Sequence, residues 1–168
     1  MTKKKVAING FGRIGRLVFR AYLERSQEFN DTYEISYIND LADIDSNIHL
    51  LKYDSVHGAL SQKVQKTADN KFKVGENEII ITSEKNPVDL NWGEKGVDII
   101  LECTGVFASK EKALSHVESG AKKVIVSAPC TNADFTVVQG VNHESMSCLL
   151  YTSPSPRDAT LSRMPSSA

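Results

Sequence analysis

Gly10-Phe11-Gly12-Arg13-Ile14-Gly15 is the stretch that decides the fold of this chain. A short apolar run, Lys5-Val6-Ala7-Ile8, precedes it, and apolar residues at helical spacing follow it. Three glycines at this spacing, between a strand and a helix, are typical of a βαβ unit that binds a dinucleotide. We expect Gly10 to permit a tight turn, Gly12 to let the backbone approach a pyrophosphate, and Gly15 to let the helix pack closely on the strand.

The helix that follows the glycines is predicted to bury one face, formed by Ile14, Leu17, Val18, Ala21 and Tyr22. Its free N–H groups and the positive end of its dipole attract a pyrophosphate without help from a cationic side chain. Arg13 and Ile14 are therefore expected to contribute mainly backbone contacts.

Asp40 follows the second predicted strand, residues 33–38. At the carboxyl end of that strand, its carboxylate is placed to accept hydrogen bonds from the ribose hydroxyls of adenosine. A 2′-phosphate would meet Asp40 as a like charge, so the sequence favours NAD over NADP. A solvated turn residue is the alternative interpretation of an isolated aspartate, and the glycine motif upstream argues against it.

The remaining pattern predicts an α/β protein with a Rossmann-type, doubly wound, mostly parallel sheet. Asp43 is predicted to cap a helix that ends near residues 52–53. Short strand-like segments at residues 63–65, 71–74 and 78–82 then predict a small antiparallel insertion at an edge of the sheet.

The parallel core is predicted to resume with residues 97–102, followed by a helix that Ser109 caps and Gly120 terminates. Further strands are predicted at residues 123–127 and 135–138.

Residues 145–168 differ in composition from the rest of the chain. They hold seven serines, three of the five prolines and no glycine. We therefore predict a domain at residues 1–144, and a serine- and proline-rich tail at 145–168 that is disordered or an artefact of the reading frame.

Bulk composition narrows the class of partner. The 168 residues include 20 basic and 21 acidic side chains, a net charge of −1, which argues against nucleic acid or an anionic membrane as the main partner. No apolar run approaches the length of a membrane span, and the amino terminus lacks the apolar core of a signal peptide. The three cysteines are odd in number and lack metal-ligand spacing, which fits a reducing compartment, so a cytoplasmic protein is expected. We predict no metal site, with surface or capping roles for its histidines, which are His49, His57, His116 and His143.

Residues 4–144 resemble phosphorylating glyceraldehyde-3-phosphate dehydrogenases. The resemblance rests on residues 8–16, Ile38-Asn39-Asp40, residues 51–58 and Glu102-Cys103-Thr104-Gly105-Val106-Phe107, and it continues through residues 120–129 and 141–143. It implies that NAD is the cofactor and that its contacts come from Gly10, Gly12, Arg13, Ile14, Gly15, Asn39, Asp40, Lys85, Thr104, Gly105 and Ser127. Among these, the resemblance implies that Arg13 and Ile14 lie at the pyrophosphate, Asp40 at the adenosine ribose, Lys85 near the adenine, and Thr104 and Ser127 near the nicotinamide.

The family's catalytic segment, Ser-x-Cys-Thr-Thr-Asn-Cys, does not occur in this sequence. Cys130 and Cys148 lack its context and are not expected to act as nucleophiles, so no catalytic residue is assigned. The resemblance implies a phosphorylated aldehyde substrate and a homotetramer only for a full-length parent enzyme. An erythrose-4-phosphate dehydrogenase fragment and a non-catalytic module that senses NAD or binds a partner remain alternatives.

Overall fold

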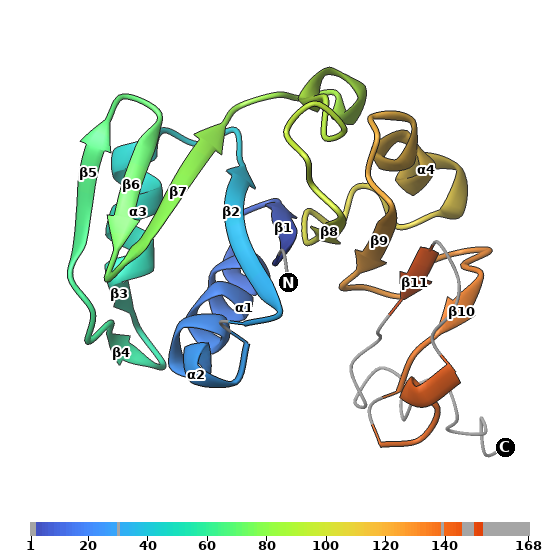
Figure 1. Cartoon of the computed structure of the whole chain (residues 1–168), viewed down its shortest axis with the longest axis horizontal. Helices are drawn as coiled ribbons and strands as arrows, with labels where there is room; N and C mark the ends of the chain where they lie inside the picture. Colours follow the sequence, from blue (N-terminus) through green and yellow to red (C-terminus); the bar gives the residue numbers. More distant parts are fainter. Residues whose placement is uncertain (1–2, 30, 139, 146–149, 153–168) are drawn as a thin grey trace, which may run out of the picture.

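The computed structural model describes residues 3–29, 31–138, 140–145 and 150–152. Within these residues, nine strands form one sheet in the order β10-β11-β9-β8-β1-β2-β7-β6-β5. Neighbours from β10 to β7 pair in parallel, whereas β5, β6 and β7 pair antiparallel. The β5 and β10 edges lie at opposite ends of the molecule (Figure 1). The predicted Rossmann-type sheet with an antiparallel insertion at one edge is confirmed.

The strands lie close to the predicted segments. The parallel strands are β1 (Lys4–Asn9), β2 (Tyr33–Asn39), β7 (Asn77–Thr82), β8 (Ile99–Glu102), β9 (Lys123–Val126), β10 (Phe135–Thr136) and β11 (Leu150–Thr152). The insertion adds β5 (Val64–Ala68) and β6 (Lys71–Val74), and a separate hairpin joins β3 (Tyr53–Asp54) to β4 (Gly58–Ala59). Strand β8 begins two residues later than predicted, and β10 ends two residues earlier.

Helices cover both faces of the sheet, as a doubly wound fold requires. They are α1 (Arg13–Glu24), α2 (Ser26–Phe29), α3 (Ile44–Lys52) and α4 (Lys110–Glu118), with 3-10 turns η1 (Pro87–Leu90) and η2 (His143–Ser145). Residues of α1 and α3 share one hydrophobic core, and α4 contributes to a second core with Trp92. The chain winds in opposite directions from β1 to β2 and from β8 to β9, so the fold predicts a ligand site at their carboxyl ends.

Capping side chains fix the starts of two helices as predicted. The Asp43 carboxylate accepts a hydrogen bond from the Ser46 backbone N–H over 2.8 Å, and the Ser109 hydroxyl accepts one from Lys112 N–H over 3.4 Å. After α4, Gly120 has a φ of +101°, in the left-handed region that ends helices.

The buried face of α1 differs from the predicted one. Gly15, Phe19, Tyr22 and Leu23 are buried, whereas Ile14 is 48% exposed. The predicted face and the buried face are offset around the helix by about one residue, and α1 carries apolar residues on both faces. Leu17 and Val18 are half-buried and Ala21 is exposed; Val18 and Ala21 instead line an open apolar groove beside Ile99, Leu101 and Ile125.

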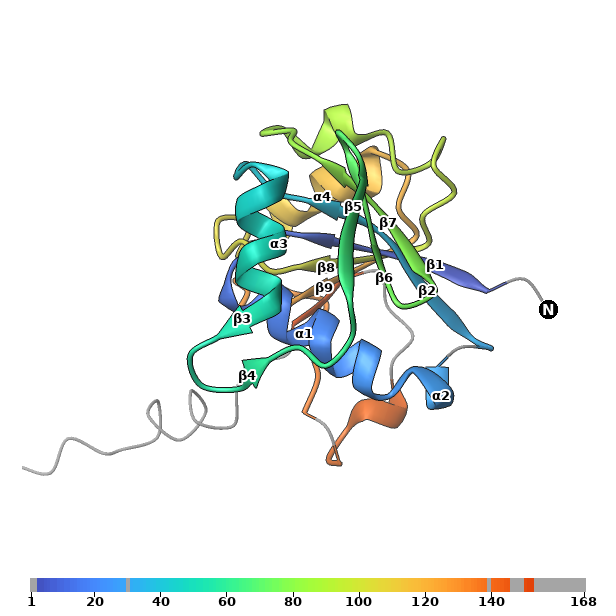
Figure 2. The ribbon, with the colours of Figure 1, turned by 90° about the vertical axis from the view of Figure 1, so that its left-hand side faces the viewer.

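Arg20 is also buried on α1, where its guanidinium is satisfied by backbone carbonyls. It donates to the carbonyl oxygen of Leu51 over 2.6 Å and to that of Gly58 over 3.0 Å. These bonds hold the β3–β4 hairpin beside α1 (Figure 2).

Two further predictions need correction. Residues 150–152 were expected to lie outside the fold, yet they form β11, whose backbone pairs with β9 and β10. Backbone pairing does not depend on the serine and proline content of the surrounding sequence, which was the basis of the prediction. His116 was expected to have a surface or capping role, but this residue of α4 is fully buried.

Candidate functional site

The glycine turn at the end of β1 is shaped by two close contacts. Gly10 has a φ of +91°, and a Cβ atom there would lie 2.7 Å from the backbone nitrogen of Thr104. A Cβ atom on Gly15 would lie 2.1 Å from the carbonyl oxygen of Gly10. Gly10 and Gly15 are therefore required by the packing of the protein itself, in agreement with the turn and packing roles predicted for them.

Gly12 has no such requirement. Its φ of −67° suits any residue, and no protein atom lies within 4 Å of the position that a Cβ would occupy. The backbone at Gly12 is thus open to an approaching ligand.

The amino terminus of α1 lies at the same place. No side chain caps this terminus, and its first turn carries no acidic residue. Its free N–H groups and positive dipole end are available to an anion.

Asp40 lies half-buried directly after β2 and contacts the glycine turn. Its Oδ2 accepts a hydrogen bond from the Phe11 backbone N–H over 2.7 Å, and its Oδ1 accepts one from Ala42 N–H over 2.9 Å. Because a carboxylate has about four acceptor positions, Asp40 retains capacity for two more donors.

A cavity of about 490 Å³ opens at the carboxyl ends of β1, β2 and β8. Six of the predicted site residues line it: Gly10, Gly12, Asn39, Asp40, Lys85 and Thr104. Six lining residues were not predicted to contact the cofactor: Asn9, Leu41, Glu84, Cys103, Val106 and Phe107. Leu41 and Val106 are 64% and 62% exposed, and an exposed apolar residue directly after a predicted site residue was the signal that could have identified them.

The other five predicted residues do not line this cavity. Arg13 is half-exposed, and its guanidinium lies 3.4 Å from the Asp54 carboxylate. The Ser127 hydroxyl donates a hydrogen bond to the backbone oxygen of Glu102 over 3.0 Å. Ile14 and Gly15 belong to the first turn of α1, and Gly105 lies exposed beyond Thr104 with a φ of +74°.

The side chain of Asn39 is buried and already hydrogen-bonded. Its Nδ2 donates to Asn9 Oδ1 over 2.8 Å and to the backbone oxygen of Glu84 over 2.9 Å. Its Oδ1 accepts from the Glu84 backbone N–H over 2.9 Å. Asn39 therefore ties the segment that carries Lys85 to the end of β1.

Two thiol groups have raised pKa values. Burial raises the pKa of the Cys103 thiol to about 11, and the charge of Glu102 adds to this increase. Burial also raises the pKa of Cys130. A raised pKa disfavours the thiolate form of both groups. Cys148 lies outside the described residues.

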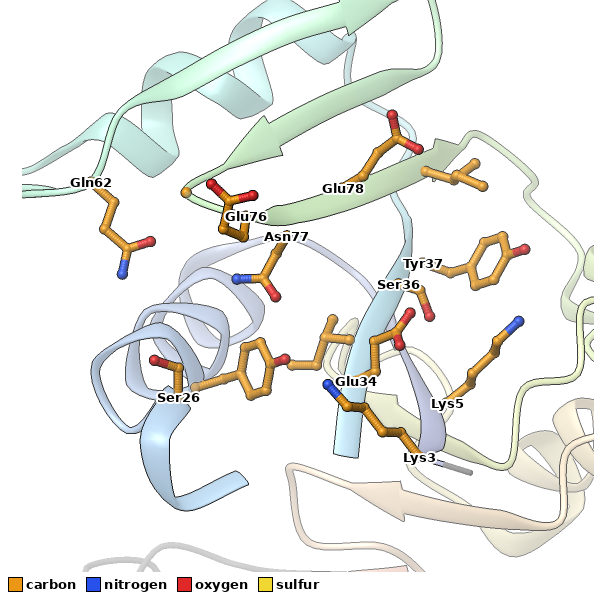
Figure 3. Close-up of a pocket in the computed structure, with 14 residues that line it drawn as sticks. Lys3, Lys5, Ser26, Glu34, Ser36, Tyr37, Gln62, Glu76, Asn77 and Glu78 are labelled. Atoms are coloured by element: carbon orange, nitrogen blue, oxygen red, sulfur yellow. The ribbon is translucent and has the colours of Figure 1, made fainter. Parts of the chain in front are cut away.

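A second cavity, of about 750 Å³, lies at the amino ends of β1 and β2 (Figure 3). It contains none of the predicted site residues. Three carboxylates line it, those of Glu34, Glu76 and Glu78, together with Lys3 and Lys5. The predicted residues and the free amino terminus of α1 both lie at the other cavity, beside Gly12, which is therefore the candidate site.

Within the described residues, no group of three or more His, Cys, Asp or Glu side chains is placed to hold a metal ion. No helix in the same part of the chain has both the length and the apolar character needed to cross a membrane.

Comparison with known proteins matches residues 4–110 to the family model described as "Glyceraldehyde 3-phosphate dehydrogenase, NAD binding domain". A glyceraldehyde-3-phosphate dehydrogenase of Geobacillus stearothermophilus is 52% identical over 140 residues, which are 83% of this chain and 40% of the relative. Those of Cereibacter sphaeroides and Xanthobacter flavus are 49% and 51% identical over 142 residues, or 84% of this chain and 41% of each relative. The chain thus spans about two fifths of the length of the curated relatives that it matches.

Proposed function

This chain belongs to the glyceraldehyde-3-phosphate dehydrogenase family, and we propose that it holds NAD in the cavity at the carboxyl ends of β1, β2 and β8. The matched family domain is an NAD-binding domain, so NAD is the cofactor. When bound, NAD supplies a hydride acceptor.

The observation that carries the proposal is the open backbone at Gly12. Its φ is ordinary and no protein contact fills the space beside it, so a ligand can come close to the backbone there. A pyrophosphate placed against Gly12 would meet the free N–H groups of Arg13 and Ile14 and the positive end of α1. The half-exposed Arg13 guanidinium, directed at Asp54, is not needed for this contact.

Asp40 is proposed to bind the adenosine ribose. Its two unused acceptor positions match the two ribose hydroxyls, and hydrogen bonds to a charged acceptor contribute about 1.5–3 kcal/mol. A 2′-phosphate would be repelled by the same carboxylate, which favours NAD over NADP.

The remaining predicted residues are proposed to bind the two ends of NAD. Lys85 and the apolar surface of Leu41 lie on the cavity wall beside Asp40, where the adenine would extend from its ribose. Thr104 lies on the wall formed by β8, where the nicotinamide side is proposed to lie, together with Gly105 and Ser127.

For a full-length parent enzyme, we propose the family's activity, the oxidation of a phosphorylated aldehyde coupled to its phosphorylation. A homotetramer is proposed for the same protein. Burial raises the pKa of the Cys103 and Cys130 thiols, which disfavours their thiolate forms, and this chain's proposed part is to bind and orient the hydride acceptor. Residues 1–144 are proposed as the NAD-binding domain.

Isothermal titration calorimetry on the 168-residue chain tests the proposal. We expect saturable binding of NAD and weaker binding of NADP. Folded, monodisperse protein that releases no heat at millimolar NAD would contradict it. Equal affinity for the two dinucleotides would contradict the role of Asp40.

A further inference from the structure

A cluster of buried polar side chains lies directly beneath the proposed NAD site. We call it the Glu102 network and define it as Asn9, Trp92, Glu102, Thr104 and His116. Asn9, Glu102, Trp92 and His116 are each at least 98% buried. Buried polar groups are costly unless they are hydrogen-bonded, so their partners decide what the cluster does.

Four hydrogen-bond donors converge on the Glu102 carboxylate. Oε2 accepts from Asn9 Nδ2 over 2.5 Å and from His116 Nε2 over 2.9 Å. Oε1 accepts from the backbone N–H of Thr104 over 2.7 Å and from the Thr104 hydroxyl. These four donors match the four acceptor positions of an ionised carboxylate.

Trp92 fixes the tautomer of His116. An indole nitrogen can only donate, and Trp92 Nε1 lies 3.2 Å from His116 Nδ1, so Nδ1 must be the unprotonated acceptor. The imidazole proton is then on Nε2, which lies 2.9 Å from Glu102 Oε2 and 3.3 Å from Asn9 Nδ2, so the Asn9 amide donates to Glu102 and not to the ring. His116 is accordingly a neutral donor to a charged acceptor.

Two members of the network, Asn9 and Thr104, line the cavity, and Phe107, which also lines it, contacts His116. Thr104 packs against Gly10 so closely that no Cβ fits between them. Its hydroxyl, which donates to Glu102, also accepts from the Val106 backbone N–H over 3.0 Å. The Phe107 ring packs edge-on against His116, with ring centroids 5.7 Å apart.

We propose that Glu102 is a positioning residue for cofactor binding, which holds the turn at Thr104 against the glycine turn. This inference rests on the proposed NAD site. Glu102 acts through Thr104 and does not line the cavity itself. Its charge is the essential property, because only a carboxylate accepts from all four donors at once.

An amide at this position conflicts with the network. It offers two acceptor positions, and its NH₂ group would face either Thr104 or, on the other side, both the Asn9 amide and the Nε2–H of His116. His116 could accept from the amide only by moving its proton to Nδ1, where it would oppose the indole N–H of Trp92. A second substitution that removes the indole N–H relieves the part of this conflict that lies at His116.

The experiment measures NAD dissociation constants by calorimetry for Glu102→Gln, Trp92→Phe and the double variant of the 168-residue chain. We expect Glu102→Gln to raise the dissociation constant at least tenfold. We expect the dissociation constant of the double variant to be at least threefold lower than that of Glu102→Gln. Each substitution alone should lower the melting temperature. A merely structural role predicts the opposite, with the double variant binding worst.

Asp98→Asn is the matched control. Asp98 is a carboxylate just before β8, and it pairs with the exposed Lys122 over 2.6 Å. It lies at the other end of the strand from the cavity, so NAD affinity should stay within twofold of that of the unsubstituted chain.

The outcomes separate the two proposals. If the unsubstituted chain does not bind NAD, the proposed function fails. If it binds, but folded Glu102→Gln binds equally well or the double variant shows no recovery, the role of Glu102 is overturned.

Should Glu102→Gln not fold, nuclear magnetic resonance on the unsubstituted chain decides. Trp92 is the only tryptophan, so its indole N–H gives a single resonance. Trp92 does not line the cavity, yet the network joins it to Thr104. We expect NAD to shift this resonance and His116 to carry its proton on Nε2. An unshifted resonance at saturating NAD, or a proton on Nδ1, overturns the inference.

Discussion

The Asp40 carboxylate accepts a hydrogen bond from the backbone N–H of Phe11 over 2.7 Å. The residue proposed to bind the adenosine ribose thereby also holds the glycine turn proposed to bind the pyrophosphate. Two parts of the site that are 29 positions apart in sequence are coupled by this one bond. A substitution at Asp40 is expected to affect both.

Asp40→Ala and Asp40→Asn separate these two effects. The alanine removes every acceptor and should weaken NAD binding by about 1.5–3 kcal/mol, which is roughly 10- to 150-fold. The asparagine retains one oxygen for Phe11 N–H and should lose less. Both should reduce the preference for NAD over NADP, because the repelling charge is gone. Calorimetric titrations with both dinucleotides measure this, and an unchanged NAD affinity for Asp40→Ala would contradict the ribose assignment.

Gly12→Ala should weaken NAD binding with little change in stability, whereas Gly15→Ala should reduce both. The Gly12 methyl group enters open space, so we expect a change in unfolding free energy of only about 0.5 kcal/mol and at least tenfold weaker NAD binding. The Gly15 methyl group would lie 2.1 Å from the Gly10 carbonyl oxygen, so that variant should lose stability as well as binding. Urea unfolding with parallel NAD titration compares them. Full NAD affinity in Gly12→Ala would show that nothing enters that space.

Arg13→Ala and Lys85→Ala form a pair of charge-removing variants. Exposed ion pairs such as Arg13–Asp54 contribute about 0–1 kcal/mol to stability. Because the Arg13 side chain does not line the cavity, we expect Arg13→Ala to change NAD affinity by less than about threefold. Lys85 lies on the cavity wall, and its loss should cost more, about 0.5–1 kcal/mol, with a larger effect at low salt. Titrations at two ionic strengths test both, and a reversed order would contradict the backbone role of residue 13.

Cys103 should make the protein less stable at alkaline pH. Its pKa of about 11 in the folded chain lies above the ordinary thiol value, so the folded state binds the proton more tightly than the unfolded state. The resulting stabilisation is complete below about pH 8.5 and is lost as the pH rises toward 11, to an extent of about 2–3 kcal/mol. Urea unfolding at pH 8 and pH 11 should show a smaller loss for Cys103→Ala than for the unsubstituted chain. Equal losses would argue that the thiol is not desolvated.

Local sequence was sufficient for much of the fold, and six of the eleven predicted site residues line one cavity. The glycine spacing, the caps at Asp43 and Ser109, and the left-handed Gly120 each depend on a few neighbouring residues, and their predicted structures are confirmed. The position of Asp40 at the cavity follows from the βαβ pattern, whereas that of Lys85, which follows β7, was implied only by the family resemblance.

Features that depend on distant partners were missed. Burial of His116 requires Trp92 and Glu102, which lie 24 and 14 positions away. The periodicity of α1 fits two faces equally well, and only the position of the sheet determines that Phe19 is buried while Ile14 is exposed. Neither fact is contained in a local pattern.

Strand β10 pairs with β11, and β11 pairs with β9. Within the part of the chain that the structure describes, β10 pairs with no strand other than β11. The attachment of β10, residues 135–136, to the sheet therefore depends on β11, residues 150–152, which lies beyond position 144. A chain cut at residue 144 would therefore keep the glycine turn but present the bare side of β9, a template on which a second molecule could add its own strand. Light scattering should then detect concentration-dependent self-association that the 168-residue chain does not show.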